Sequence, residues 1–154
     1  MKNLFFPFLI FIAYFSANSC KEEGCRDEIA NNFNPEANVE DFTCTYEAEN
    51  MVGTFQVEGY KIAYQTTDTI HYTYNLSISY IQKNNVVLKN LGGMDQTIGA
   101  SLYDNNDRIQ LTKTNKDSLG TWAGQGTYYN SNSFGLVYTE GLNPTKHVDI
   151  ATRL

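Results

Sequence analysis

The chain has 154 residues, with 17 Asp and Glu against 11 Lys and Arg, and a formal net charge of −6. The excess acid is confined to residues 20–50, which hold nine acids and two bases, whereas residues 51–154 hold eight of each. Nucleic-acid binding therefore finds no support, because a clustered basic patch is its usual footprint. The acidic stretch predicts a spacer that is repelled from an anionic membrane surface.

The first element is an apolar run over residues 4–15, behind a single positive charge at Lys2. It is too short to span a bilayer, which needs about 20 residues. A basic start, an apolar centre and a small-residue end predict a secretory signal over residues 1–19. We therefore expect an exported protein.

Cys20 follows directly on Ala17-Asn18-Ser19, and a small residue before a cysteine resembles the lipobox of bacterial lipoproteins. The resemblance implies cleavage before Cys20 and acylation of its thiol and amine by chains of the palmitate type. Lys21-Glu22-Glu23 resembles the export signal of surface lipoproteins of Bacteroidota. The expected location is then the outer membrane, with the protein anchored on the face toward the cell exterior. A periplasm-facing lipoprotein and a soluble secreted protein are the alternatives.

Residues 24–46 run Gly-Cys-Arg-Asp, then Ala-Asn-Asn-Phe-Asn-Pro, and end Asp-Phe-Thr-Cys-Thr-Tyr. This spacing resembles a short module of Bacteroidota surface proteins. The resemblance implies a disulfide between Cys25 and Cys44 within a tether over residues 20–50. Oxygen donors at Asp27, Asn34 and Asp41 are weak candidates for Ca²⁺, since Asx residues in tight loops more often bond their own backbone.

Residues 70–80 show the clearest secondary-structure pattern of the chain. Apolar and aromatic side chains alternate with polar ones, which predicts a half-buried strand. Shorter apolar stretches follow, separated by turns at Asp104–Asp107 and Asn130–Ser133. The further predicted strands cover residues 53–64, 86–90, 98–102, 109–111, 122–129, 134–138 and 147–154.

Two of these strands carry a specific prediction about side-chain direction. In residues 53–64 the apolar parity changes beside Gly59, which predicts a β-bulge. In the last strand, Val148 and Ile150 alternate with His147 and Asp149, which predicts that the polar pair faces solvent.

Seven to eight strands with short connections predict an all-β domain over residues 51–154, either a single antiparallel up-and-down barrel or a sandwich. We favour closure, because a barrel removes exposed sheet edges. Gly53–Val57, Val86–Asn90 and a Gly-x-Gly-Thr turn at Gly124–Thr127 are similar to small Bacteroidota lipoprotein domains. That resemblance implies a lipocalin-like barrel of undefined activity.

The sequence offers little evidence of catalytic chemistry. The two histidines, His71 and His147, are both expected at solvent-facing strand positions, and no Gly-x-Ser-x-Gly motif accompanies them. A hydrolase would need a nucleophile, a base and an acid within mutual reach. We therefore predict a non-enzymatic protein with no catalytic residue, no metal beyond the calcium candidates and no cofactor.

The expected role is binding of a small or apolar ligand, which would require an apolar cavity with a few convergent polar groups. The alternative is a protein-interaction or hydrolase-inhibitor module, which would have a filled barrel. Inward-pointing Tyr72, Tyr74 and Tyr80 would favour the filled barrel.

Overall fold

The computed structural model describes residues 21–112, 122–141 and 145–154. The described residues form two compact units, one within Met1–Glu28 and Asn32–Cys44, and one within Ile29–Asn31 and Thr45–Leu154. The smaller unit contains a short parallel pair, β1 (Glu23–Gly24) and β2 (Val39–Glu40). The larger unit contains the barrel.

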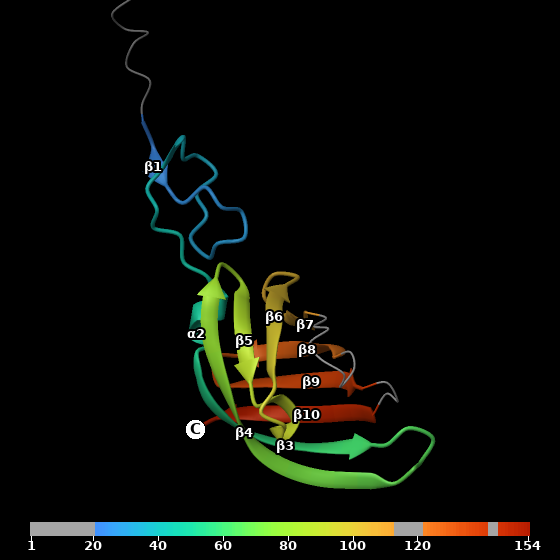
Figure 1. The fold of residues 1–154 in the computed structure, drawn as a ribbon. Coiled ribbons are helices and arrows are strands. Elements are labelled where there is room, and N and C mark those ends of the chain that lie inside the picture. The colour runs from blue at the N-terminus through green and yellow to red at the C-terminus, as the bar shows by residue number, and fades with distance from the viewer. Residues whose placement is uncertain (1–20, 113–121, 142–144) are drawn as a thin grey trace, which may run out of the picture. The chain divides into compact units, whose positions relative to one another are not determined.

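Eight described strands close into an antiparallel barrel, in which each strand pairs with the next along the chain and β10 pairs with β3 (Figure 1). The expected up-and-down barrel is therefore confirmed. Closure leaves no strand edge unpaired within this sheet. The strands are β3 (Gly53–Ile62), β4 (Thr69–Gln82), β5 (Asn85–Lys89), β6 (Thr97–Tyr103), β7 (Arg108–Leu111), β8 (Ala123–Asn130), β9 (Ser133–Glu140) and β10 (Thr145–Arg153).

The barrel interior is filled by side chains from every strand. Leu76, Leu88 and Phe134 are each at most 1% exposed, and the rings of Phe55 and Phe134 meet edge to face with centroids 5.1 Å apart. Alternate residues of a strand point to opposite faces, so the period-two pattern of β4 sends Tyr72, Tyr74, Leu76 and Ile78 inward. Inward tyrosines thus narrow the interior.

Two short helices lie against this core. The α-helix α2 (Glu47–Asn50) precedes β3 and buries Ala48, and Met51 beyond its end is also buried. The 3₁₀-helix η1 (Leu91–Gly93) follows β5 and buries Leu91. None of the described helices is long and apolar enough to cross a membrane.

The prediction of a β-bulge at Gly59 is wrong. The register of β3 with both neighbours is continuous through Gly59, which pairs with Asp149 on one side and Tyr72 on the other. Gly59 keeps the inward parity of Phe55 and Val57, while Tyr60 lies on the outer face. A glycine inside a strand marks either a bulge or a close approach, and here it marks a close approach. The Gly-x-Gly-Thr segment, expected as a turn, likewise lies within β8.

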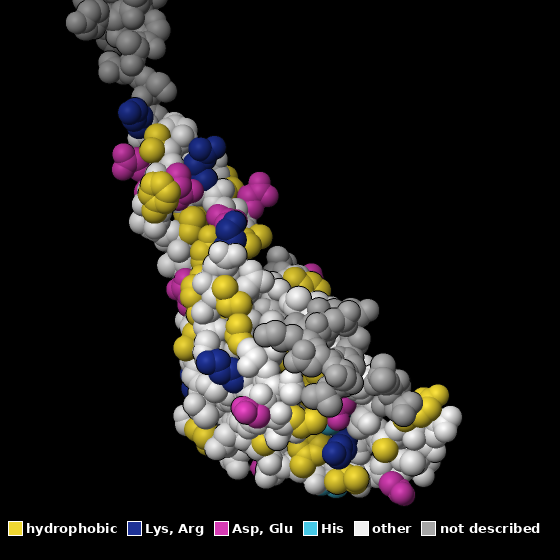
Figure 2. All heavy atoms as spheres, viewed as in Figure 1, with side chains coloured by type: hydrophobic (Ala, Val, Ile, Leu, Met, Phe, Trp, Pro, Cys, Tyr) yellow, Lys and Arg dark blue, Asp and Glu magenta, His cyan; other side chains and the backbone are white. Residues whose placement is uncertain are grey.

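The predicted hairpin turns are confirmed. Asp104–Asp107 links β6 to β7, and its first three residues adopt left-handed conformations, with φ between 53° and 68°. Asp and Asn tolerate that region better than other non-glycine residues. In Figure 2 charged side chains crowd the smaller unit, whereas the visible face of the barrel is mostly uncharged.

Candidate functional site

A cluster of polar side chains lies inside the barrel where β4, β9 and β10 converge. The alternation of β4 directs Tyr72 and Tyr74 inward, and that of β10 directs His147 and Asp149 inward. From β9, Tyr138 joins them. We call these five residues the buried polar network. Tyr72 and Tyr74 lie 77 and 75 residues from Asp149 in the sequence, so only the closed sheet brings them against it.

Asp149 is the centre of the network. It is 2% exposed, and its carboxylate accepts hydrogen bonds from the phenols of Tyr74 at 2.7 Å, Tyr138 at 2.9 Å and Tyr72. A buried carboxylate is costly unless it is hydrogen-bonded, and bonds to an ionised acceptor are among the strong ones. The three phenols therefore replace the water that this carboxylate has lost.

Gly59 makes room for that carboxylate. A Cβ atom built at Gly59 would collide with Oδ1 of Asp149 and lie 2.8 Å from the carbonyl oxygen of Val148. Gly124 and Gly126 act in the same way on β8, where a Cβ would meet the backbone or side chains of Tyr138 and Leu136. Glycines at these inward positions thus serve close packing of neighbouring strands.

His147 extends the network. It is 1% exposed, its Nδ1 lies 2.8 Å from the hydroxyl of Tyr72, and its ring stacks on Tyr138 with centroids 4.6 Å apart. Trp122 stacks on the same tyrosine at 5.7 Å. On its other side, Nε2 of His147 lies 3.1 Å from Oε1 of Glu140. The imidazole is thus held between a phenol and a carboxylate.

The environment keeps the phenols protonated. Burial is the main cause that raises the pKa of Tyr72, Tyr74 and Tyr138 far above the usual value for tyrosine, and the nearby Asp149 charge adds to it. A neutral phenol is the form that can donate to the carboxylate, so burial and hydrogen bonding act in the same direction.

The prediction that His147 and Asp149 face solvent is wrong. Alternation along β10 is present as expected, but the sides are reversed: Ile150 is 58% exposed and the polar pair is inside. Hydrophobicity alone assigns the apolar parity to the core. The signal that could have corrected it is Gly59, an inward glycine that leaves space for one polar group from the neighbouring strand.

His71 does face solvent, as expected, and its ring lies 5.9 Å from that of Tyr60 on the outer face. The hydrolase alternative required a serine and an acid within reach of a histidine. Among the described residues, His147 makes a hydrogen bond to Tyr72, and the carboxylate of Glu140 lies 3.1 Å from its Nε2. This arrangement contains no serine nucleophile.

Two hollows lie on the outer face and adjoin across β10. The first, of about 510 Å³, lies over β3, β4 and β10 and contains Glu58 and Tyr60; the second, of about 380 Å³, lies over β7 to β10 and contains Arg108 and Tyr129. Both include Val148 and Ile150.

Large apolar side chains are exposed around the second hollow. Val137 and Ile150 are 44% and 58% exposed, and Tyr129 is 61% exposed. Gly135 lies between them, and a Cβ there would be 3.2 Å from the hydroxyl of Tyr129. We call Tyr129, Gly135, Val137, Val148 and Ile150 the outer apolar strip.

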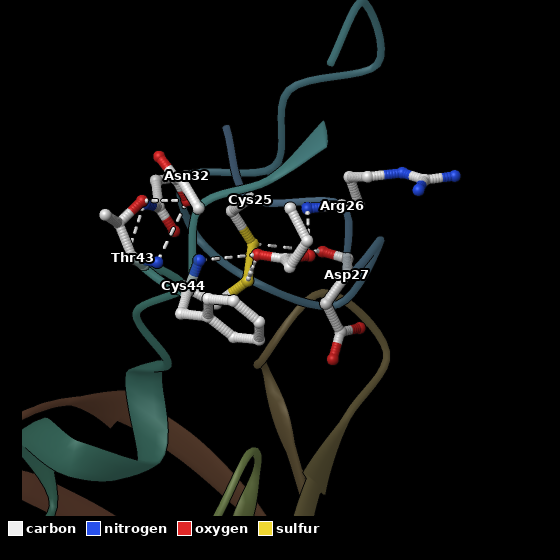
Figure 3. Close-up of a disulfide and its surroundings, with 9 residues drawn as sticks. Cys25, Arg26, Asp27, Asn32, Thr43 and Cys44 are labelled. Atoms are coloured by element: carbon white, nitrogen blue, oxygen red, sulfur yellow. Dashed lines mark hydrogen bonds between the residues drawn. A yellow bond between two sulfur atoms is a disulfide. The ribbon is translucent and has the colours of Figure 1, made fainter. Parts of the chain in front are cut away.

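In the smaller unit, Cys25 and Cys44 form the expected disulfide, at a sequence separation of 19 (Figure 3). The loop is held further by the side-chain amide of Asn32, which donates to the carbonyl of Thr43 at 2.8 Å (Figure 3). Glu40 accepts the backbone N–H of Arg26 at 3.0 Å. These contacts give the unit its order where its hydrophobic core is small.

Two of the weak calcium candidates, Asn34 and Asp41, make hydrogen bonds within their own turns. Asn34 accepts the backbone N–H of Glu36, and Asp41 accepts both the N–H and the hydroxyl of Thr43 at 3.0 and 2.7 Å. These are the local turns that Asx residues commonly make, and the bonds from Thr43 lower the pKa of Asp41.

One group of three potential metal ligands occurs among the described residues, namely Cys25, Glu40 and Cys44. Two of its three ligand atoms are the sulfur atoms of the disulfide. Those sulfurs are not available as thiolates, which are the form that binds metal. The group therefore does not support a metal site.

Cys20, the predicted lipidation site, lies outside the described residues. Its acylation and the signal over residues 1–19 stay predictions that rest on the sequence.

Comparison with known proteins places the chain in no family. No family model matches it, and no curated protein matches it. Among solved structures, a redesigned β-barrel is similar over 70% of this chain and 95% of its own, with 14% identity and a TM-score of 0.49. A structural-genomics protein of unknown function from Bacteroides ovatus is similar over 66% of this chain and 41% of its own, with 14% identity and a TM-score of 0.46.

Proposed function

We propose that this chain is a lipid-anchored cell-envelope protein that binds a partner protein through the outer surface of its barrel. The observation that carries the proposal is the contrast between a filled interior and an apolar outer face. Fully buried side chains and the buried polar network occupy the inside, whereas Tyr129, Val137 and Ile150 of the outer apolar strip are exposed. The filled-barrel alternative stated above thus has more support than an internal site for an apolar ligand.

The chemistry of the strip favours a protein as its partner. Exposed aromatic and aliphatic side chains at the centre of a patch, with charged groups at its edge, are typical of protein interfaces. Glu58 and Arg108, at the far sides of the two hollows, supply edge charges of opposite sign. Mixed charge gives no preference for nucleic acid or for an anionic lipid surface.

Anchoring is proposed from the sequence around Cys20. Several acyl chains hold a membrane far better than one, since each buried CH₂ adds about 0.8 kcal/mol. Intact mass spectrometry of protein purified from the membrane fraction tests this part. A mature chain that begins at Cys20 with added acyl mass supports the anchor, and an unacylated chain that begins elsewhere contradicts it.

Site-specific photocrosslinking in cells tests the partner. A photoreactive residue at position 150, in the strip, is compared with one at position 77, an outer position of β4 away from both hollows. We expect one discrete crosslinked protein from position 150, none from position 77, and loss of the product in V137K. Equal labelling from both positions would contradict the proposal.

A further inference from the structure

Two rows of outward side chains cross the barrel face that bears the outer apolar strip, where β3, β10, β9, β8 and β7 pair side by side (Figure 1). Within each row, neighbouring residues are register partners on adjacent strands. The first row consists of Glu58, Ile150, Gly135, Thr127 and Arg108, and the second of Tyr60, Val148, Val137, Gln125 and Gln110. In both rows β9 is the middle strand.

The charges that line the two hollows stand at opposite ends of the first row. Glu58 is the exposed acid of the first hollow and Arg108 the exposed base of the second, whereas the carboxylate of Asp149 points into the barrel. No described residue forms an ion pair with Glu58 or Arg108. Since each lies two strands from β9, the row has an acidic end, a basic end and an uncharged middle.

A row with this symmetry is complementary to a copy of itself turned end to end. A two-fold axis parallel to β9 places β3 of one copy over β7 of the other, and β10 over β8, as in an isologous interface. Glu58 of each copy then lies opposite Arg108 of the other. Ile150, which is 58% exposed, faces Thr127 and enters the second hollow of the other copy.

The centre of this face carries the side chains that a self-contact needs. Val137 lies on the middle strand, is 44% exposed, and meets Val137 of the other copy. Tyr129 is 61% exposed, and its hydroxyl lies over Gly135, 3.2 Å from where a Cβ would be. Aromatic anchors at the centre and charged groups at the rim are typical of protein interfaces.

Closure of the barrel restricts the kind of partner that this face can take. Both edges of β9 are paired, with β8 and with β10, so an extended peptide cannot add a strand here. A partner must offer a base opposite Glu58, an acid opposite Arg108 and an apolar surface between them. A second copy offers all three at the required separation, roughly 19 Å for four strand spacings.

We propose that the partner bound by this face is a second copy of the chain, related to the first by a two-fold axis along β9. This inference rests on the proposed function, because it names the partner of the same outer surface. Two reciprocal ion pairs between Glu58 and Arg108 flank an apolar centre formed by Val137, Ile150 and Tyr129 of both copies.

Charge reversal gives a test that a self-pairing face passes and a face for another protein does not. E58R places Arg opposite Arg at both ends and R108E places Glu opposite Glu, so we expect each variant to self-associate about tenfold more weakly. The double variant E58R/R108E forms both pairs with reversed sign and should recover the affinity of the parent protein. A mixture of the two single variants should also associate, because both of its pairs join an acid to a base.

Energy transfer between copies of the full chain in detergent, labelled separately with donor and acceptor dyes, measures the affinity. K89E, a charge reversal at an exposed position of β5 outside both hollows, is the matched control and should associate like the parent protein. Unchanged urea midpoints verify that the variants are folded. Unchanged association in both single variants, or no recovery in the double variant, would overturn the proposal.

Photocrosslinking from position 137 distinguishes this inference from the proposed function. Because Val137 meets its own counterpart, we expect a product with twice the mass of the chain. A discrete product of any other mass would overturn the second copy as the partner and leave the proposed binding surface in place. Absence of every product would contradict the proposed function as well.

Discussion

At the scale of single residues, one glycine and one aspartate determine the character of the barrel interior. Asp149 is buried with three phenol donors, and Gly59 leaves the space that its carboxylate fills. The two residues are cross-strand partners, so a substitution of either one changes the contacts of the other. Sequence hydrophobicity does not reveal this pairing, because it places polar residues outside.

We expect Gly59→Ala to lower the free energy of unfolding by about 1–3 kcal/mol, since the added methyl group overlaps the Asp149 carboxylate and the backbone of β10. Gly99→Ala is the matched control. Its Cβ would lie 3.3 Å from Oγ1 of Thr112, a side chain that can shift. Urea denaturation of both variants checks the prediction, and equal small effects would contradict it.

At the scale of elements, the helix α2 and the barrel are joined by polar contacts as well as by packing. Tyr128 donates to Glu47 at 2.8 Å. The guanidinium of Arg153 lies 4.8 Å from the ring centroid of Phe55. It also donates to the carbonyls of Ser131 at 2.8 Å, Val52 at 2.8 Å and Asn50 at 2.6 Å. Arg153 thereby ties the end of α2 to the β8–β9 hairpin.

We expect Arg153→Lys to cost about 1–3 kcal/mol, because a single ammonium cannot reproduce the planar fork that reaches three carbonyls. Lys146→Arg, at an exposed position of the same strand, should change stability by less than about 0.5 kcal/mol. Urea denaturation of the two variants provides the measurement. The midpoints are comparable where the dependence of the unfolding free energy on urea concentration is unchanged. A loss of similar size in both would refute this role of Arg153.

The smaller unit depends on its disulfide. A bridge that closes a loop of this length contributes about 3 kcal/mol in the chain-entropy model. We expect the Cys25→Ser, Cys44→Ser double variant to lose protection from hydrogen exchange over residues 25–28 and 32–44. The amides of β3 to β10 should keep theirs, because the barrel is a separate compact unit. Loss of protection throughout the chain would show that the barrel needs the bridge.

At the scale of the whole molecule, alkaline pH tests the buried polar network. Burial and the Asp149 charge raise the pKa of Tyr138, which is 1% exposed. The folded state therefore retains a proton that the unfolded state loses above about pH 10. Stability is fully present below that pH and should then fall by about 1.4 kcal/mol per pH unit for this phenol.

Ionisation followed at 295 nm, together with far-ultraviolet circular dichroism, checks this expectation. The phenols of Tyr72, Tyr74 and Tyr138, whose pKa values are raised by burial, should ionise only with unfolding. Tyr138→Phe should show a shallower loss of stability above pH 10. Ionisation of every tyrosine in one step near pH 10, with the fold unchanged, would contradict the prediction. The buried polar network would then be accessible to hydroxide.

The sequence by itself determined the all-β class, the hairpin turns and the alternation of β4, because these depend on local backbone preference and on a period of two. It also predicted the Cys25–Cys44 pair through its resemblance to a known module. Only the tertiary structure decided which face of β10 is inside. Its polar residues are buried because closure of the barrel brings Gly59, Tyr72 and Tyr74 against them, and that proximity between distant segments is absent from any local pattern.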